Sequence, residues 1–519
     1  MSKLSRLDNY LQASTRRITL VLGGLKIAKA IVSFLVIVVS ASYFGTSSER
    51  DAWVMAGSLI LLFIQLFFGP INETFRAKFI HIREEESEEK VRELTNALIS
   101  IIFWVSVAIC SILVILNTQI ADWFAPGFSK EQLNILSKMI IILVPSLILL
   151  ELINIYTSIL NAYRSFFLPD ILSLISAFIT IAVVVTMSNK VGIYSLIISS
   201  YAGSLLLLIG LNRNLKKYHN YTFSLNFPHF KSIIPFVIFA LPLYVNYIFS
   251  QADIWIEKSL TTKMGIGSVS MLDYARKFAE LPNGMIISVV TTVLTPILAV
   301  SFYKSQKEML NETQKYFRLI AFVTIPISIM LVVFSREIIE FSLVRGKFTK
   351  ELVPETAILL TWCGVGIFSN IFYIIYAQVL VAKKKVYVFS KIVILTFIFK
   401  ILFNLFFYKK LGLITFPISS LLSNVLMGFV MLFVAFPKDL KTVFKEAAII
   451  CFVFFLLWIT FNYFSYLQLF GNHLILKILL DFLLILVAEF LIILILPIEE
   501  KYIFLSKIKS LLGRNECKN

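Results

Sequence analysis

The chain has 519 residues, of which 58% are hydrophobic, and its formal net charge at pH 7 is +17. This apolar share exceeds the ~45–50% of ordinary soluble proteins, and the apolar residues form blocks long enough to cross a bilayer, which excludes a soluble globular protein. The basic residues stand in short segments between these blocks. That placement excludes a nucleic-acid-binding surface and favours cytoplasmic loops beside anionic lipid.

Apolar windows of helix length predict about 14 membrane-spanning helices. In chain order they cover residues 18–44, 52–79, 93–117, 136–162, 167–188, 191–212, 231–257, 270–302, 316–335, 355–381, 386–408, 411–436, 443–466 and 473–497. Residues 1–17 are polar and basic and lead into the first span without a small-residue cleavage site, which predicts an uncleaved first helix. The expected fold class is therefore an all-α polytopic membrane protein.

The charges of the loops predict the orientation of these spans. Lys and Arg concentrate in alternate loops, at residues 16–17, 76–92, 216–217, 304–318, 383–385 and 438–445, and in the C-terminal tail. The loops on the opposite side carry fewer than half as many. By the positive-inside rule, both termini are expected in the cytoplasm.

An internal repeat at an offset of about 220 residues predicts two related halves. The matching segments are Lys190-Val191-Gly192 with Lys410-Leu411-Gly412, Ile198-Ser199-Ser200 with Ile418-Ser419-Ser420, and Phe128-Ser129-Lys130-Glu131 with Phe348-Thr349-Lys350-Glu351. We expect an N-terminal lobe at 1–220, a C-terminal lobe at 221–440, and spans 13 and 14 with a basic cytoplasmic tail at 441–519. Duplicated membrane folds commonly bind substrate between their halves and work by rocking, which indicates a transporter.

Polar side chains follow helical spacing inside several spans. The stripes are Gln65, Asn72 and Arg76 with Glu73 beside them; Glu151, Asn154 and Ser158; Asn246, Ser250, Asp253 and Glu257; and Asp273, Arg276, Lys277 and Glu280. Helical periodicity places each set on one face. Because a charge inside a bilayer costs at least ~2.5–3.5 kcal/mol, such residues are usually functional or paired.

These stripes give two sets of candidate site residues. We expect a substrate-binding cavity lined by Lys26, Lys29, Asn72, Glu73, Arg276 and Lys277. We expect ion or proton coupling at Glu151, Asp253 and Glu257, with Na⁺ or H⁺ as the candidate ion. Arg276 and Lys277 are expected to face a water-accessible cavity.

Structural explanations remain open for the same residues. Asp273 and Lys277, and likewise Arg276 and Glu280, are spaced to pair along one helix. Glu257 lies near a span end, Lys26 can extend back to the surface, and Glu151 with Asn154 can join helices. A further pair, Lys391 and Lys400, stands nine residues apart on opposite helix faces, so the two are not expected to line one cavity.

The sequence predicts neither an enzyme nor a cofactor. It contains no Walker A loop, no His pair with metal-ligand spacing among its 4 His, and no metal or disulfide pattern among Cys110, Cys363, Cys451 and Cys517. We therefore expect a transporter that uses an ion gradient or the membrane potential and not ATP.

Several motifs resemble the MurJ/MviN family of lipid II flippases. They are Phe44-Gly45 with Asp51-Ala52; Ala125-Pro126-Gly127-Phe128; Ile159-Leu160-Asn161-Ala162-Tyr163-Arg164 with Pro169; Gly267-Ser268-Val269-Ser270 with Tyr274-Ala275, Leu281-Pro282, Gly284 and Pro296; and Gly346-Lys347-Phe348-Thr349. The likeness runs from about residue 18 to residue 436.

This resemblance implies a MOP-superfamily fold of two six-helix lobes in a V, with two extra C-terminal helices that form a groove for a lipid tail. It implies a location in the inner membrane of a bacterial cell. It also implies a cationic cavity for the pyrophosphate and sugars of an undecaprenyl-linked precursor, in which Arg276 and Lys277 are expected to contact the pyrophosphate. The chain departs from the family at Ala30, Val36 and Ile64, which stand where the family has arginines in its first two spans, whereas Lys277 keeps the basic position of the eighth span.

The expected function is a flippase that moves an undecaprenyl-pyrophosphate-linked glycan, first of all lipid II for peptidoglycan synthesis, to the outer leaflet by alternating access. Three alternatives stay open. One is a flippase for another polyprenyl-linked oligosaccharide, of exopolysaccharide, capsule or O-antigen type. The second is a MATE-like exporter of small cations, and the third a membrane glycosyltransferase. The expected partners are the lipid-linked glycan, membrane lipids and membrane enzymes of glycan synthesis, with no nucleic acid.

Overall fold

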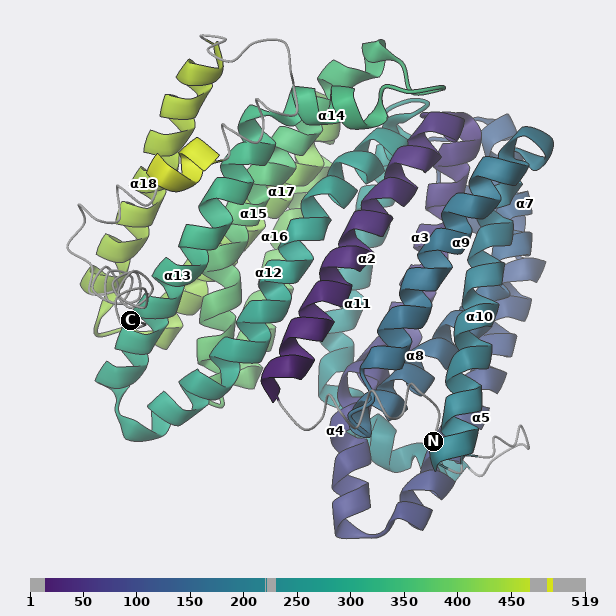
Figure 1. The fold of residues 1–519 in the computed structure, drawn as a ribbon, viewed down its shortest axis with the longest axis horizontal. Helices are drawn as coiled ribbons and strands as arrows, with labels where there is room; N and C mark the ends of the chain where they lie inside the picture. Colours follow the sequence, from purple (N-terminus) through teal and green to yellow (C-terminus); the bar gives the residue numbers. More distant parts are fainter. Residues whose placement is uncertain (1–14, 220, 222–229, 467–482, 489–519) are drawn as a thin grey trace, which may run out of the picture. The chain divides into compact units, whose positions relative to one another are not determined.

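The computed structural model describes residues 15–219, 221, 230–466 and 483–488, and these residues form helices and connecting turns without a β-strand (Figure 1). Their contacts divide them into two units. Unit 1 draws on Met1–Tyr274, Ser342–Leu352 and Asn404–Leu413, and unit 2 on Ala275–Phe341, Val353–Phe403 and Ile414–Asn519. The helix α12 (Ser268–Lys304) therefore begins in unit 1 and continues in unit 2.

Unit 1 is built mainly from consecutive helices. They are α2 (Thr15–Phe44), α3 (Ser48–Phe67), α4 (Gly69–Glu85), α5 (Glu88–Ile115), α6 (Asn117–Phe124), α7 (Lys130–Leu143), α8 (Ser146–Ala162), α9 (Phe167–Val191), α10 (Tyr194–His219), the 3₁₀ turn η1 (Phe230–Ile233) and α11 (Ile234–Thr262). Within it α9 packs on α10 and α2, α3 packs on α7, and α4 packs on α8 and α11.

Unit 2 holds most of α12 and the helices that follow it. They are α13 (Gln306–Val333), α14 (Ser335–Leu343) up to Phe341, α15 (Val353–Ala382), α16 (Val386–Leu411) up to Phe403, α17 (Thr415–Ala435) and α18 (Leu440–Tyr466). The 3₁₀ turn η2 (Lys350–Leu352) belongs to unit 1, and η3 (Gly412–Ile414) lies where the chain passes from unit 1 back to unit 2. Here α15 packs on α13 and α17, and α18 packs on α13 and α17.

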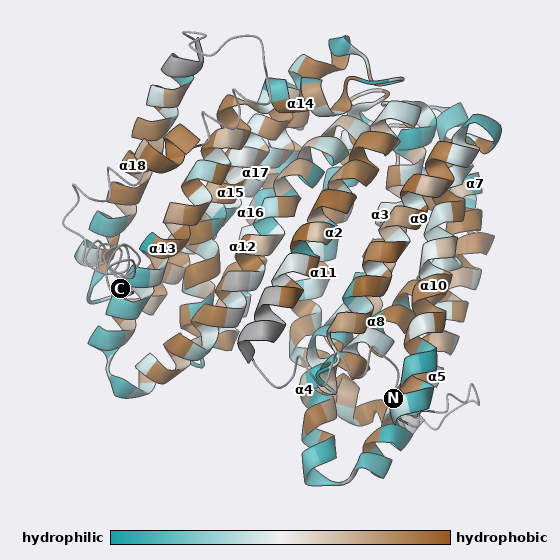
Figure 2. Ribbon diagram, viewed as in Figure 1, coloured by the Kyte–Doolittle hydropathy of each residue, from teal (hydrophilic) through white to brown (hydrophobic). Residues whose placement is uncertain are grey.

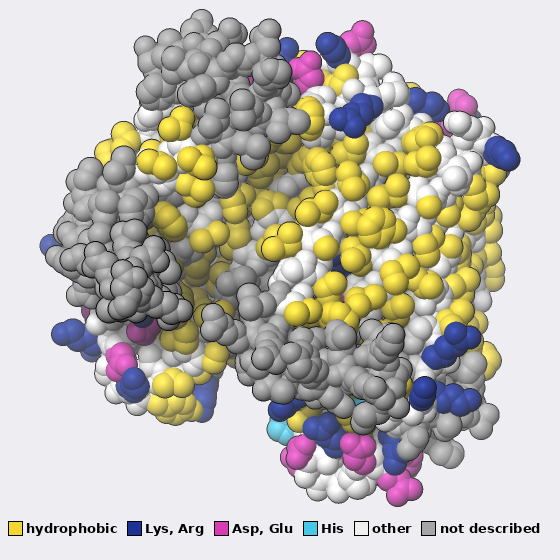
Figure 3. Space-filling view, viewed as in Figure 1, with side chains coloured by type: hydrophobic (Ala, Val, Ile, Leu, Met, Phe, Trp, Pro, Cys, Tyr) yellow, Lys and Arg dark blue, Asp and Glu magenta, His cyan; other side chains and the backbone are white. Residues whose placement is uncertain are grey.

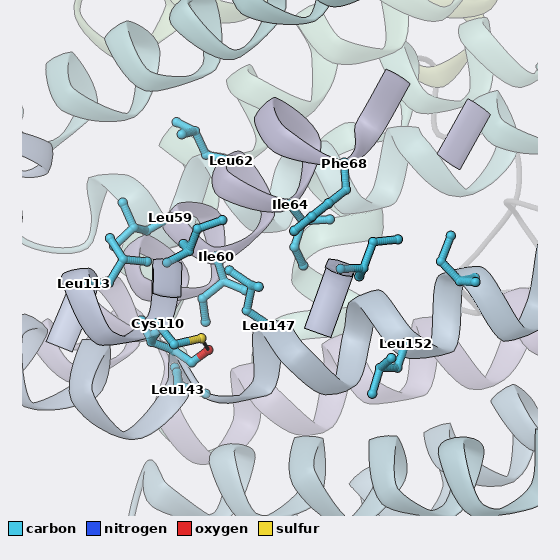
Figure 4. Close-up of a cluster of buried hydrophobic side chains, with 14 of the residues drawn as sticks. Leu59, Ile60, Leu62, Ile64, Phe68, Cys110, Leu113, Leu143, Leu147 and Leu152 are labelled. Carbon is cyan, nitrogen blue, oxygen red and sulfur yellow. Dashed lines mark hydrogen bonds between the residues drawn. The ribbon is translucent and has the colours of Figure 1, made fainter. Parts of the chain in front are cut away.

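A close-packed apolar core holds the helices of unit 1 together. Figure 4 shows Leu59, Ile60, Leu62, Ile64 and Phe68 of the α3 segment beside Cys110 and Leu113 of α5, Leu143 of α7, and Leu147 and Leu152 of α8. Lipid tails are as apolar as these side chains, so burial from water does not drive this association. The fit of the side chains supplies it, through many small dispersion contacts.

The outer face of unit 1 suits lipid. Figure 2 shows apolar residues along α2, α9 and α10, and Figure 3 shows hydrophobic side chains covering this face, with charged side chains near the helix ends. Ile31 of α2, Phe178 of α9 and Ile209 of α10 are 57%, 52% and 49% exposed. Exposed apolar surface of this extent on long helices is expected where lipid covers it.

The predicted spans before residue 467 fall on helices, with differences in detail. Among the described residues, eleven helical segments have the length and hydropathy of a membrane span; one of them, Val386–Ala435, comprises α16 and α17. The predicted span 136–162 is the pair α7 and α8, bent by 47° beside Pro145, which makes a twelfth span if the pair is counted as one. The predicted span 473–497 lies largely outside the described residues.

The predicted second span, 52–79, is wrong as a single helix. α3 ends at Phe67, and α4 begins at Gly69 with Pro70 in its first turn. Proline has no N–H to continue the hydrogen-bond ladder, so it fits the start of a helix better than its interior. The second half of α4 carries Arg76, Lys78 and Arg83, so α4 is not among the segments apolar enough to cross a membrane.

A glycine turn joins α2 to α3 and to the loop before η2. Gly45 has φ +55°, and a Cβ built on it would lie 2.5 Å from the carbonyl oxygen of Lys347. The Lys347 N–H donates to the Ser42 carbonyl over 2.8 Å, which holds the two backbones in contact. Only glycine fits a position that combines a left-handed backbone with so close an approach.

Replacing Gly45 with alanine is therefore expected to lower stability by about 1–3 kcal/mol, the usual cost of a strained backbone position. Gly57→Ala is the matched control, because Gly57 lies within α3 with no atom near its added Cβ, and alanine is the better helix former there. The measurement is thermal unfolding of the two variants in detergent. Equal unfolding temperatures would show that the turn has no such requirement.

Candidate functional site

Polar side chains inside unit 1 gather where α4, α8 and α11 meet. Glu151 of α8 is fully buried, and its Oε2 accepts hydrogen bonds from Asn72 Nδ2 of α4 over 3.2 Å and from Asn154 Nδ2 over 3.3 Å. Its Oε1 has no hydrogen-bond partner in the structure. A buried carboxylate bound on only one oxygen keeps a position open for a proton or a cation.

The start of α4 is held against α11 by two tyrosines. The Tyr247 hydroxyl donates to Glu73 Oε2 over 2.8 Å, and the Tyr244 hydroxyl donates to the Phe67 carbonyl over 2.9 Å. A Cβ on Gly69 would lie 2.3 Å from the Tyr247 ring. The absence of a side chain at Gly69 therefore lets the Tyr247 ring pack against the start of α4. We name Asn72, Glu73, Glu151, Asn154 and Tyr247 the carboxylate cluster.

The other candidates of unit 1 are on α11 and α2. Asp253 and Glu257 are buried on α11, at 3% and 2% exposure. Lys26 and Lys29 both lie exposed on α2. Of the predicted set, the structure thus joins Asn72 to Glu151, joins the exposed Glu73 to Tyr247, and leaves both lysines exposed. Tyr247 was not among the predicted site residues. The one signal for it in the sequence was its place next to Asn246.

A second group of charges closes the turn where α2 meets α3. The Arg50 guanidinium is 1% exposed and binds Asp273 of α12 through Nη2 over 2.9 Å and the Tyr274 hydroxyl through Nε over 3.3 Å. Asp51 accepts from the Gly267 N–H over 2.6 Å and from the Ser270 N–H and hydroxyl over 2.8 and 2.5 Å. We name Arg50, Asp51, Ser270, Asp273 and Tyr274 the buried charge cluster, and it belongs entirely to unit 1.

Unit 2 contains a polar pocket of about 240 Å³ between α12, α15, α16 and α17. Its lining residues are Arg276, Ala279, Glu280, Asn283, Cys363, Gly366, Ile367, Asn370, Lys400, Pro417, Ser420 and Asn424. Arg276 and Lys400 supply positive charge and Glu280 supplies negative charge. The helical spacing of Arg276 and Glu280 predicts one shared face, and both line this pocket.

Lys277 and Lys391 lie elsewhere in unit 2. Lys277 is half-buried on α12 and is not part of the lining, while Lys391 is exposed over the Tyr387 ring, with its Nζ 4.5 Å from the ring centre. Lys400 was not among the predicted cavity residues, yet it lines the pocket. Asn283, Asn370 and Asn424 were missed as well, and the available signal was an amide inside an otherwise apolar span.

Within the described part of the chain, no group of three or more His, Cys, Asp or Glu side chains could hold a metal ion. What the clusters offer instead is a cationic and hydrogen-bonding pocket in unit 2 and a buried carboxylate in unit 1. Both lie among helices of membrane-spanning length. This arrangement suits a transporter of an anionic, hydrogen-bonding ligand.

Comparison with known proteins gives a consistent result. The family model "Lipid II flippase MurJ" matches residues 40–489. The chain is 28% identical over 439 residues to the lipid II flippase MurJ of Thermosipho africanus, covering 83% of this chain and 88% of that one. It is 24% identical over 411 residues to the probable lipid II flippase MurJ of Buchnera aphidicola from Schizaphis graminum, covering 75% and 78%.

Solved structures show the same fold. One titled "Lipid II flippase MurJ, inward closed conformation" aligns with a TM-score of 0.75 at 20% identity, over 91% of this chain and 98% of that chain. An inward-facing MATE family transporter of the MOP superfamily aligns with a TM-score of 0.66 at 10% identity, over 80% and 96%. These likenesses establish the helical architecture, in agreement with the predicted fold class.

Proposed function

The chain belongs to the lipid II flippase MurJ family, and we propose that it moves lipid II across the bacterial inner membrane by alternating access, with part of the head group held in the unit 2 polar pocket. The observation that carries this proposal is the pocket itself. Arg276 and Lys400 line the pocket among apolar membrane helices. Charged side chains are rare at such positions and commonly mark the path of a substrate or ion. A pyrophosphate supplies acceptor oxygens that match an Arg fork and a Lys ammonium.

The alternatives account less well for the same observations. The MATE neighbours share the fold at 10% identity, but a pocket with two cations and one carboxylate does not suit a small cationic drug. A flippase for another polyprenyl-linked glycan would use the same pocket chemistry, yet the curated relatives that match are named as lipid II flippases. A glycosyltransferase does not fit a family of transporters.

The direct test is reconstitution of the full chain into ATP-free liposomes that contain lipid II, with flipping followed as accessibility from the outer leaflet. We expect flipping to respond to an imposed ion gradient or membrane potential, and both termini to face the cytoplasmic side. We expect no requirement for ATP, because the sequence has no nucleotide-binding loop. Flipping that appears only when ATP is added would contradict this proposal.

Glu151 is proposed to carry the coupling ion or proton. Glu151→Gln keeps the shape and the amide contacts but removes the titratable charge, so flipping should lose its response to the gradient while lipid II still binds. Ser158→Ala, on the same helix α8, is the control and should leave the response intact. A gradient response that survives in Glu151→Gln would move the coupling site to another residue.

An apolar pocket in unit 2 supports a separate site for the lipid tail. It has a volume of about 530 Å³ and is lined from α13, α15, α17 and α18, with Trp362, Phe368, Phe454 and Trp458 among its walls. Phe368 of α15 and Phe454 of α18 stack with ring centres 4.3 Å apart. We propose that α18 and this pocket hold the polyprenyl chain, and that the last predicted span, which lies largely outside the described residues, takes part in the same function.

Tryptophan quenching by a brominated polyprenyl phosphate tests this tail site. The ligand should quench the wild type, and Trp458→Phe should lose a large part of that quenching because it removes an indole in the pocket wall. Trp104→Phe is the control, since Trp104 lies on α5 of unit 1 and is 40% exposed. Identical quenching of Trp458→Phe and the wild type would place the tail elsewhere.

A further inference from the structure

Three asparagines form a continuous hydrogen-bonded chain along the polar pocket of unit 2. Asn370 Nδ2 of α15 donates to Asn283 Oδ1 of α12 over 3.0 Å, and Asn424 Nδ2 of α17 donates to Asn370 Oδ1 over 2.5 Å. All three side chains are half-buried and line the pocket. The hydrogen-bonded amides therefore connect three helices and form part of the pocket lining.

Joining helices does not by itself explain this arrangement. A hydrogen bond across membrane helices contributes modestly to their association and needs only one pair of side chains. The same two helices already have such a pair, because Thr295 Oγ1 of α12 donates to Gln378 Oε1 of α15 over 2.6 Å. The asparagine chain differs from that pair in facing a pocket that also holds Arg276 and Lys400.

The groups left over on the amides identify the ligand chemistry. Each carboxamide has two N–H donors and an oxygen with two lone pairs. Two hydrogen bonds among three amides leave N–H donors and acceptor lone pairs available to a ligand in the pocket that they line. Ser420 adds acceptor capacity, because its hydroxyl donates to the Phe416 carbonyl over 3.0 Å and keeps its lone pairs. A phosphate offers only acceptors, whereas sugar hydroxyl and acetamido groups offer both.

The size of the pocket limits how much of the ligand it takes. Its volume of about 240 Å³ is smaller than the ~300–1,000 Å³ of sites that enclose a whole drug-sized molecule. A single ring fits this description better than an entire head group. The cations of the same pocket, Arg276 and Lys400, are suited to the phosphate that is attached to that ring.

We propose that Asn283, Asn370 and Asn424 form a sugar-recognition subsite, which binds the hydroxyl and amide groups of the first sugar of a pyrophosphate-linked glycan. The proposal rests on the proposed function and adds to it the residues that select cargo. A site built to hydrogen-bond a ligand discriminates strongly against an analogue without those groups, since its own polar groups then stay unpaired. The asparagines thus set specificity, and the cations set affinity for the shared pyrophosphate.

Binding to the purified full chain in detergent tests the subsite with two probes, lipid II and undecaprenyl pyrophosphate without sugar. Asn370→Leu keeps the side-chain size and removes both amide contacts. We expect its Kd for lipid II to rise about tenfold, as the loss of one or two hydrogen bonds of ~1 kcal/mol predicts. Its Kd for undecaprenyl pyrophosphate should stay at the wild-type value. Arg276→Gln should instead weaken both probes.

Thr295→Val is the matched control, because it removes an α12–α15 hydrogen bond that lies outside the pocket lining and should alter neither Kd. If Asn370→Leu does not fold, Asn283→Ala provides the milder test. Asn283 is the terminal member of the three hydrogen-bonded asparagines and accepts a single hydrogen bond, from Asn370. If Asn370→Leu changed the Kd for both probes equally, or for neither, the sugar-recognition subsite would be overturned. The proposed function would still stand as long as the wild type flips lipid II. Failure of the wild type to flip lipid II would overturn the function itself.

Discussion

Replacing Arg276 and Lys277 together with glutamine should abolish lipid II flipping while leaving the amount of folded protein unchanged. Arg276 lines the polar pocket of unit 2, and Lys277 follows it on α12. A charge-assisted hydrogen bond contributes ~1.5–3 kcal/mol, and one Arg can make two of them to a phosphate, so their loss predicts a decrease of about 100-fold or more. Glutamine retains hydrogen bonding and length but not the positive charge.

The measurement is the initial rate of flipping in liposomes at matched protein content. Lys391→Gln is the control, since it removes one positive charge from an exposed position over Tyr387, away from the pocket lining. The two single variants separate the contributions of Arg276 and Lys277 to the flipping rate. Arg276→Gln should account for the larger part, because Arg276 lines the pocket and Lys277 does not. A double variant that flips at the wild-type rate would be inconsistent with a cationic head-group site.

Asp273→Leu is expected to destabilise unit 1 by about 3–5 kcal/mol, because it leaves the Arg50 guanidinium buried without its carboxylate. Arg50 is 1% exposed, stacks over Trp53 and Tyr274 with its Cζ 4.6 and 5.0 Å from their ring centres, and cannot lose its proton. The charge cannot reach water by a simple rotation. The loss therefore exceeds that of breaking an ion pair at the surface.

Thermal unfolding in detergent measures this effect, and a second variant shows its origin. Arg50→Met combined with Asp273→Leu removes both charges and should recover most of the stability, as replaced buried ion pairs do elsewhere. Glu308→Ala breaks the exposed pair of Lys304 with Glu308, whose atoms lie 2.7 Å apart, and should change stability little. If the double variant were as unstable as Asp273→Leu, the stranded charge would not be the cause.

The chain's local patterns were sufficient for its fold class, its family likeness and most of its spans up to residue 466, the second span excepted. Blocks of apolar residues longer than a bilayer is thick can form little other than helices, since every backbone group must bond internally. Helical spacing also placed Glu151 beside Asn154, which the structure joins through one oxygen, and Arg276 beside Glu280 in one pocket. These are relations within a single helix.

Relations between helices were decided only by the tertiary structure. Asn72 binds Glu151 from 79 residues away, Arg50 binds Asp273 from 223 residues away, and Asn370 joins Asn283 across 87 residues. A 3.6-residue period tells which side chains share a face but not which helix that face meets. In a bilayer this ambiguity is greatest, because lipid is as apolar as the neighbouring helices and hydrophobicity no longer marks the buried side. The partners are selected instead by a few polar contacts and by close fit, such as that of Gly69 against the Tyr247 ring.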